Sequence, residues 1–244
     1  MRGGGVDQLM PDPRPFSHIL FDLDRTLTFY PVPTAGVVTS TFARLGLSIS
    51  SLGSAEDIAS RYDALWVALE RDADSADELR LAAWRRLIAE RGLPADGLAE
   101  RISAEYGVVR RANGVRLFDG VRELLRDLRA AGYRLALLTN GLSDAQWDKI
   151  RSLEIEPCFD AIAVAGDTGL YKPDRRAFAA LLDRLRAEPH RSLFVGDSYE
   201  TDIVGAHAAG LATAWVRPEG TPVPGNLMPQ YAFPGVLDVR AVVL

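Results

Sequence analysis

The 244-residue sequence predicts an α/β protein, in which a parallel sheet with helices on both faces is interrupted by an all-helical insertion. Two observations predict this fold class. From residue 119 onward, short apolar runs alternate with amphipathic stretches, a pattern typical of consecutive strand–helix units. Between residues 29 and 114 the apolar residues recur only at helical spacing, so this segment is expected to fold as a bundle of helices.

The first strand is expected at residues 18–21, an apolar run that leads into Asp22-Leu23-Asp24. Side chains i and i+2 of a strand point to the same face, so both carboxylates can reach one site. Burying two such charges is costly unless a cation receives them. Two interpretations stay open at this point: a site for Mg²⁺, which prefers oxygen ligands, or solvated acids at an ordinary strand end.

The remaining elements of the core follow in order. We expect strands at residues 134–138, 159–164, 192–195 and 213–216, and helices near residues 120–131, 143–152, 174–187 and 200–209. With the first strand these units predict a doubly wound, Rossmann-like sheet. The catalytic core is expected to comprise residues 16–30 and 115–244, and the helical insertion residues 31–114. The Gly- and Pro-rich residues 1–15 are expected to form a loose tail.

The composition argues against several classes of protein. Hydrophobic residues make up 48% of the chain and charged residues 25%, which is ordinary for a soluble globular protein. A net charge of −5 gives no basic surface for nucleic acid, and no apolar stretch approaches the length of a membrane span. The single cysteine, Cys158, excludes an internal disulfide and a multi-cysteine zinc site. Because the N-terminus lacks the apolar core of a signal peptide, we expect a cytoplasmic protein.

The choice of basic residues singles out one lysine. The chain has 26 arginines and two lysines, Lys149 and Lys172. A lysine retained among so many arginines suggests a site that needs a compact point charge. Lys172 stands before Pro173 in a loop, so we expect it to be functional. Lys149 lies within an expected helix and is interpreted as a solvated surface residue.

Polar residues that suit phosphoryl chemistry follow the later strands. Thr139-Asn140-Gly141 ends one strand, and Gly196-Asp197-Ser198 ends another, with Asp202 shortly after. Lys172 lies in the loop between these two units. Ligands of open α/β sheets bind at the carboxyl ends of the strands, so these groups are expected at one edge. A plainer interpretation remains for some of them, because Thr139, Asn140 and Ser198 are also common helix-capping residues.

Four of these segments together resemble the ordered motifs of the haloacid dehalogenase-like hydrolase superfamily. They are Phe21-Asp22-Leu23-Asp24-Arg25-Thr26-Leu27, Leu138-Thr139-Asn140-Gly141, Lys172-Pro173-Asp174, and Gly196-Asp197-Ser198 with Asp202. The resemblance spans roughly residues 18–216, and the helical insertion stands where the family carries a cap. The motifs are most similar to the helical-cap phosphatases, which include nucleotidases and sugar-phosphate phosphatases.

The resemblance implies a Mg²⁺-dependent phosphatase that hydrolyses a small phosphorylated metabolite through an aspartyl-phosphate. Asp22 would be the nucleophile, and Asp24 would donate a proton to the leaving alcohol and then activate water. Mg²⁺ would be held by Asp22, the backbone carbonyl of Asp24 and Asp197. Asp202 would act through a metal-bound water or hold Lys172.

The resemblance also implies which groups bind the phosphate. Thr139 and the amide groups around Asn140 would hold its oxygens at a strand-to-helix junction. Lys172 would stabilise charge on the nucleophile and on the transferring phosphoryl group.

Several alternatives stay open. Asp24 favours a phosphatase over a dehalogenase, because a leaving halide needs no proton, but sugar phosphomutases of the same superfamily also carry both acids. A phosphate-accepting signalling domain or a binding-only protein would be a different class altogether. Both are less consistent with the motif order, the helical insertion and the complete set of acids.

One residue departs from the family pattern. Arg25 stands where members usually carry a small, polar or acidic residue, and we expect it either to recruit an anionic substrate or to pair with an acid of the cap. Substrate contacts are expected from the segments that connect the insertion, at Phe29, Tyr30, Arg110, Arg111 and Asn113. Neither the substrate nor the oligomeric state follows from the sequence.

Overall fold

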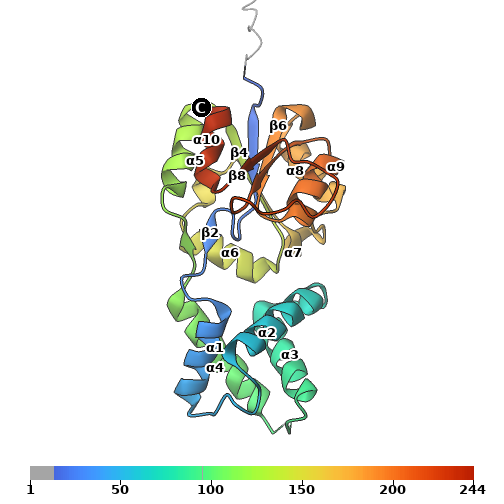
Figure 1. Cartoon of the computed structure of the whole chain (residues 1–244). Coiled ribbons are helices and arrows are strands. Elements are labelled where there is room, and N and C mark those ends of the chain that lie inside the picture. The colour runs from blue at the N-terminus through green and yellow to red at the C-terminus, as the bar shows by residue number, and fades with distance from the viewer. Residues whose placement is uncertain (1–13, 95) are drawn as a thin grey trace, which may run out of the picture.

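The computed structural model describes residues 14–94 and 96–244. Figure 1 shows an α/β unit that carries both ends of the described chain, with a smaller unit of helices next to it. The tail expected at residues 1–15 lies almost entirely outside the described residues. In the described ranges, no helix has both the length and the apolar character needed to cross a membrane.

Six parallel strands form the sheet of the α/β unit within the described residues, in the order β5-β4-β1-β6-β7-β8. The central strand β1 pairs in parallel with β4 on one side and with β6 on the other. Asp22, Thr139 and Asp197 therefore lie at the carboxyl ends of three adjacent strands. The strands are β1 (His18–Phe21), β4 (Arg134–Thr139), β5 (Ala161–Val164), β6 (Ser192–Gly196), β7 (Ala212–Val216) and β8 (Tyr231–Phe233).

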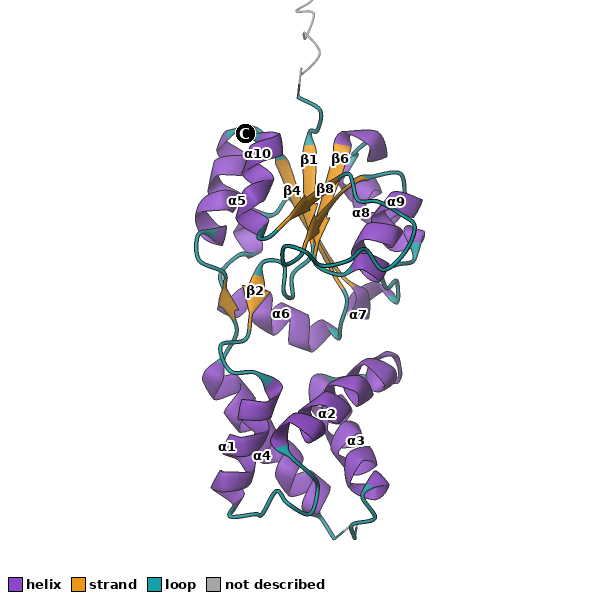
Figure 2. Cartoon of the chain, viewed as in Figure 1, coloured by secondary structure: helices purple, strands orange, loops and turns teal. Residues whose placement is uncertain are grey.

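Helices cover both faces of this sheet (Figure 2). Ile19 and Phe21 of β1 pack in one apolar cluster with Leu124 of α5, whereas Leu20 between them packs in a second cluster with Phe178 of α8. The alternation follows from strand geometry, which sends successive side chains to opposite faces. The predicted fold class is confirmed. The helices of this unit are α5 (Val121–Ala130), α6 (Ser143–Ser152), α7 (Ala165–Thr168), α8 (Arg175–Leu185), α9 (Gly205–Ala208) and α10 (Arg240–Val243).

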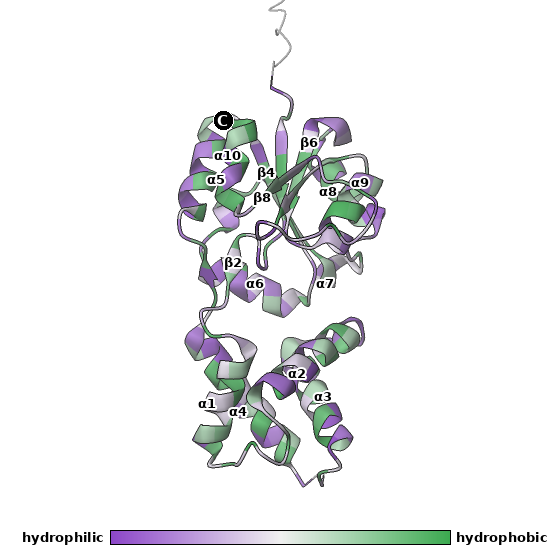
Figure 3. Ribbon diagram, in the orientation of Figure 1, coloured by the Kyte–Doolittle hydropathy of each residue, from purple (hydrophilic) through white to green (hydrophobic). Residues whose placement is uncertain are grey.

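The inserted helices have a core of their own. Trp84 lies at its centre, with its ring centroid 5.7 Å from that of Tyr106 and 5.3 Å from that of Tyr62. Ser54 and Ser75 begin two of the helices by accepting hydrogen bonds from backbone N–H groups. Hydrophobic and hydrophilic positions alternate along the helices of both units (Figure 3). The inserted helices are α1 (Thr34–Leu45), α2 (Ala55–Leu69), α3 (Ala76–Glu90) and α4 (Leu98–Asn113).

Three short strands were not predicted. A short antiparallel pair, β2 (Thr28–Phe29) and β3 (Arg116–Leu117), joins the two units where only connecting loops were expected. The edge strand β8 lies in a Pro-rich segment. Each of these strands has only two or three residues, which is too few to show an apolar periodicity in the sequence.

The helix expected near residues 200–209 is divided. Residues Tyr199–Val204 form a wide π-helical turn, and only then does α9 begin. The Ser198 hydroxyl accepts the Thr201 N–H, and the Asp202 carboxylate accepts the Ser198 N–H. The structural role of Ser198 is confirmed, and the widened turn carries Asp202 back to the end of β6. Wide turns of this kind are frequent at functional sites.

Candidate active site

A buried lysine joins two of the predicted acids. Lys172, 2% exposed, places its Nζ 2.6 Å from Asp22 Oδ1 and 2.8 Å from Asp202 Oδ1. Burial alone would lower the pKa of Lys172, but the charges of Asp202 and Asp22 raise it above its ordinary value. The lysine is therefore a fixed positive charge beside Asp22, as the sequence predicted.

The acids around Lys172 are suited to a divalent cation. Asp22, Asp197 and Asp202 each direct one carboxylate oxygen into a cluster in which these atoms lie within 4.8 Å of one another. Asp22 Oδ2 is buried and has no hydrogen-bond partner among the described residues. Burial, together with the neighbouring carboxylates, raises the pKa of Asp22 to about 7 and that of Asp197 to about 6. A hard cation bound by one oxygen of each of these carboxylates would offset their repulsion, so the residues fit Mg²⁺.

The carboxylate of Asp24 points to a different set of partners. Lys149 Nζ lies 2.8 Å from Asp24 Oδ1 and 2.7 Å from Asp24 Oδ2, and Gln146 Nε2 donates to Oδ2 at 3.1 Å. Burial would raise the pKa of Asp24, but the charge and hydrogen bonds of Lys149 lower it overall. The interpretation of Lys149 as a solvated surface residue is therefore wrong, since its side chain is only 14% exposed.

The loop after β4 has a bracing role that the sequence did not reveal. Asn140 Nδ2 donates to the backbone oxygen of Lys172 at 3.0 Å, and Asn140 Oδ1 accepts the Lys172 N–H at 2.8 Å. The hydroxyl of Thr139, which is 1% exposed, donates to the Asn140 carbonyl. Leu142 occupies the N-cap position of α6, which receives no side-chain capping bond, so the capping alternative for Thr139 and Asn140 is wrong.

A tryptophan anchors the loop after β6. Trp215 Nε1 donates to the backbone oxygen of Asp197 at 2.7 Å. The bond fixes Asp197 from the neighbouring strand β7. Sequence reasoning missed this residue because a strand tryptophan carries no local sign of its partner.

Arg25 pairs with an acid of the core. Its Nε lies 3.0 Å from Asp197 Oδ2, while its side chain is 77% exposed. Its backbone has φ +65°, in the left-handed region that non-glycine residues seldom adopt. The expected pairing with an acid of the cap is therefore wrong, because Arg25 contacts the acid cluster itself.

The inserted helices reach the site through a few side chains. The Arg110 guanidinium lies 4.5 Å from the centroid of the Tyr30 ring, and Lys149 Nζ lies 5.6 Å from the same centroid. In the turn after α2, Arg71 lies over the ring of Tyr171 of the α/β unit at 5.1 Å.

The other three residues expected to contact substrate have local partners. The ring of Phe29 stacks on that of Phe118, and the Asn113 side chain donates to a carbonyl of its own helix. Arg111 Nη1 lies 3.9 Å from Asp77 Oδ1. Of the five expected residues, Tyr30 therefore contacts Lys149, and Arg110 lies over the same Tyr30 ring.

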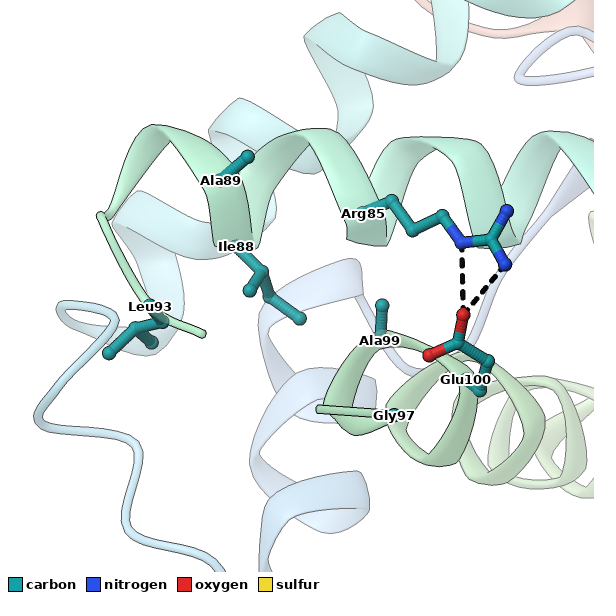
Figure 4. Close-up of a pocket in the computed structure, with 7 residues that line it drawn as sticks. All are labelled: Arg85, Ile88, Ala89, Leu93, Gly97, Ala99 and Glu100. Carbon is teal, nitrogen blue, oxygen red and sulfur yellow. Dashed lines mark hydrogen bonds and ion pairs between the residues drawn. The ribbon is translucent and has the colours of Figure 1, made fainter. Parts of the chain in front are cut away.

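A cavity of about 290 Å³ lies on the inserted helices and is separate from this site (Figure 4). None of its lining residues belongs to the acid cluster. Arg85 and Glu100 form an ion pair across it at 2.7 Å, and the other lining residues are Ile88, Ala89, Leu93, Gly97 and Ala99.

Comparison with known proteins places this site in a family. Residues 16–210 match the haloacid dehalogenase-like hydrolase family. The N-acylneuraminate-9-phosphatase of Mus musculus is 32% identical over 234 residues, which cover 92% of each chain. The HAD-hydrolase YfnB of Bacillus subtilis is 29% identical over 219 residues, covering 87% of this chain and 89% of YfnB.

The fold agrees with this assignment. A crystal structure of YfnB bound to magnesium aligns with a TM-score of 0.74 and 25% identity, covering 94% of this chain and 99% of that one. The chain belongs to the haloacid dehalogenase-like hydrolases and is an enzyme of that superfamily. The family membership predicted from the four motifs is confirmed.

Proposed function

We propose that this enzyme is a Mg²⁺-dependent phosphatase that hydrolyses a small phosphomonoester through an aspartyl-phosphate on Asp22. One observation carries the proposal: Asp22 is buried in the acid cluster with one oxygen on Lys172 and the other without a partner among the described residues. An oxygen held ready in this way is suited to attack phosphorus. The phosphatase relatives, including those named for N-acylneuraminate 9-phosphate and glyceraldehyde 3-phosphate, support the same class of reaction.

In the proposed reaction Asp22 Oδ2 forms a bond to phosphorus while the ester P–O bond breaks. Because Lys149 lowers the pKa of Asp24, this acid is ionised in the free site; it takes a proton from the bound ester monoanion and passes it to the leaving oxygen. Lys172 stabilises negative charge on Asp22 and on the phosphoryl oxygens. A water molecule then attacks phosphorus and gives a proton to Asp24, which releases phosphate and regenerates Asp22. Mg²⁺, held by Asp22, Asp197, the backbone carbonyl of Asp24 and, through water, Asp202, would neutralise charge so that two anions can approach.

The phosphate oxygens would be bound at the start of α6. Thr139 supplies a hydroxyl there, and the backbone N–H groups of the first turn of a helix favour anions. Because the Asn140 side chain is already engaged with the backbone of Lys172, its proposed contribution to phosphate binding is through its amide N–H.

The proposal assigns residues 16–30 and 115–244 to the catalytic core and residues 31–114 to a cap. In this arrangement the cap closes over the phosphate site and contacts the rest of the substrate. The substrate is proposed to be a small phosphorylated metabolite, and a cytoplasmic location stays a prediction.

The test is release of inorganic phosphate from nucleotides, sugar phosphates, phosphorylated sugar acids and an aryl phosphate, each with Mg²⁺ and with EDTA. We expect Mg²⁺-dependent release that Asp22→Asn abolishes while the protein stays folded. Isomerised sugar phosphate without phosphate release would indicate a phosphomutase. A stably phosphorylated chain without turnover would indicate a signalling role, and either result would contradict the proposal.

A further inference from the structure

We infer that Lys149 is a positioning residue, which holds Asp24 in place for proton transfer to the leaving group. The inference rests on the proposed phosphatase function and extends it to a residue outside the four motifs. It also accounts for both lysines of the chain, because each is paired with one of the two acids that follow β1.

The contacts around Asp24 are those of a clamp. Both carboxylate oxygens accept from Lys149 Nζ, at 2.7 and 2.8 Å, and Gln146 adds a third hydrogen bond at 3.1 Å. Thr28 Oγ1 lies 3.5 Å from Asp24 Oδ1 on the remaining side. Lys149 and Gln146, both on α6, therefore fix the rotation of this carboxylate.

The clamp is built on the same helix as the phosphate-binding loop. Gln146 and Lys149 are three residues apart on α6, so they lie on one face of the helix. This helix begins directly after Thr139-Asn140-Gly141, and a Cβ at Gly141 would lie 2.4 Å from Gln146 Nε2. Any movement of α6 would therefore displace the phosphate loop and Asp24 together. The distance between the proton donor and the bound phosphate would then stay the same.

A purely structural ion pair explains these contacts less well. This ion pair is only partly buried, with the Asp24 side chain 34% exposed, so solvent screening limits its contribution to stability. Gln146 directs its amide nitrogen to Asp24, which leaves its Oε1 buried without a partner among the described residues. An unpaired buried acceptor costs free energy, so this arrangement does not serve stability alone. The cap residue Arg110 also lies over the ring of Tyr30, the ring that Lys149 contacts. These contacts favour a role in the reaction.

The chemistry of the leaving group predicts which substrates should react more slowly when Lys149 is lost. When the ester P–O bond breaks, its electron pair goes to the leaving oxygen, which takes the proton of Asp24. An alkoxide is a poor leaving group and needs that proton, whereas a nitrophenolate leaves without it. A residue that acts by placing Asp24 should therefore matter for kcat/KM of alkyl esters and very little for kcat/KM of activated aryl esters. The later hydrolysis of the aspartyl-phosphate, which also uses Asp24, is common to both esters and affects kcat.

The experiment compares kcat/KM for glycerol phosphate and p-nitrophenyl phosphate in the Mg²⁺-loaded wild type, Lys149→Met, Lys149→Arg and Arg151→Met. We expect Lys149→Met to lose about 100-fold on the alkyl ester and no more than about threefold on the aryl ester. Lys149→Arg should have a kcat/KM for the alkyl ester about tenfold higher than that of Lys149→Met, because it keeps a positive charge. Arg151→Met is the matched control, since Arg151 is an exposed cation two residues further along α6.

A double-mutant cycle separates positioning from a structural effect. In an Asp24→Asn background, Lys149→Met should cause almost no further loss, because the group it positions is already gone. The same cycle in urea unfolding should show that the two substitutions are coupled, independently of activity. Equal losses on both esters, or additive losses in the cycle, would overturn the inference.

The outcomes also separate this inference from the proposed function. If the wild type releases phosphate and Asp24→Asn lowers only the alkyl reaction, but Lys149→Met behaves like Arg151→Met, the inference alone fails. If the wild type releases no phosphate from any ester, the proposed function fails and the inference falls with it.

Discussion

The acid cluster makes an unusual prediction: in the absence of metal, removing the nucleophile should stabilise the protein. Asp22 has a pKa of about 7 in the fold and, like other aspartates, about 4 in the unfolded chain. At pH 8 an acid with these two values opposes folding by about 4 kcal/mol. Asn keeps the shape of Asp22 and an oxygen that can accept from Lys172. We therefore expect Asp22→Asn to raise the free energy of unfolding by about 2 to 4 kcal/mol.

The difference in stability between the wild type and Asp22→Asn should depend on pH. Below about pH 4 the carboxyl group is protonated in both the folded and the unfolded states, so the two proteins should be equally stable. As pH rises towards 7, the unfolded chain loses the Asp22 proton first, so the wild type loses more stability than the variant, in which Asp197 still opposes folding. Above about pH 7 the difference should be constant.

Urea unfolding with EDTA at a series of pH values, followed by circular dichroism, measures this difference. Saturating Mg²⁺ should reduce or reverse it, because the metal stabilises the folded wild type through the carboxylate that the variant lacks. An Asp22→Asn protein that is less stable than the wild type at pH 8 in EDTA would refute the account of the cluster.

Three further substitutions test other parts of the site and fold. Asn140→Ala removes both bonds to the backbone of Lys172 and should lower kcat by about 10- to 100-fold in steady-state kinetics; a change below about twofold would contradict the bracing role. Arg25→Ala frees an oxygen of Asp197, so titration calorimetry should show Mg²⁺ binding about two- to fivefold tighter, and weaker binding would contradict this. Burial opposes ionisation of Asp160, but a backbone N–H and two arginines lower its pKa overall. Asp160→Asn should therefore cost stability in urea unfolding above about pH 4 and progressively less as pH falls below it, whereas a loss that is independent of pH would reject this.

The central strand and the acids after it were predictable because their signals are local. An apolar run followed by Asp22 and Asp24 identifies both the strand and the site edge. The expectation that strand geometry directs both carboxylates to one place was wrong, because β1 ends at Phe21: Asp22 joins the acid cluster, whereas the Asp24 carboxylate faces Lys149. The edge strand β8 could not be predicted, because three residues are too few to show a period. Its pairing with β7 is set by the finished sheet.

The residues missed in the site share one physical cause. Lys149 lies 125 residues from Asp24 in the sequence, and helical periodicity does not show which face of α6 will meet the turn after β1. Trp215 likewise contacts Asp197 across neighbouring strands. The scarcity of lysine was a usable signal for Lys149: applied to both lysines, it marks Lys149 as a candidate site residue, although it does not identify Asp24 as the partner.

Trapping the covalent intermediate tests the central claim most directly. The Mg²⁺-loaded enzyme would be mixed with its best phosphate ester, quenched in acid and treated with borohydride, which reduces an aspartyl-phosphate to homoserine. Peptide mass spectrometry should then find homoserine at position 22 and nowhere else, with none in a sample that lacks substrate. Phosphate release without any modification at position 22, or homoserine at another aspartate, would contradict the account.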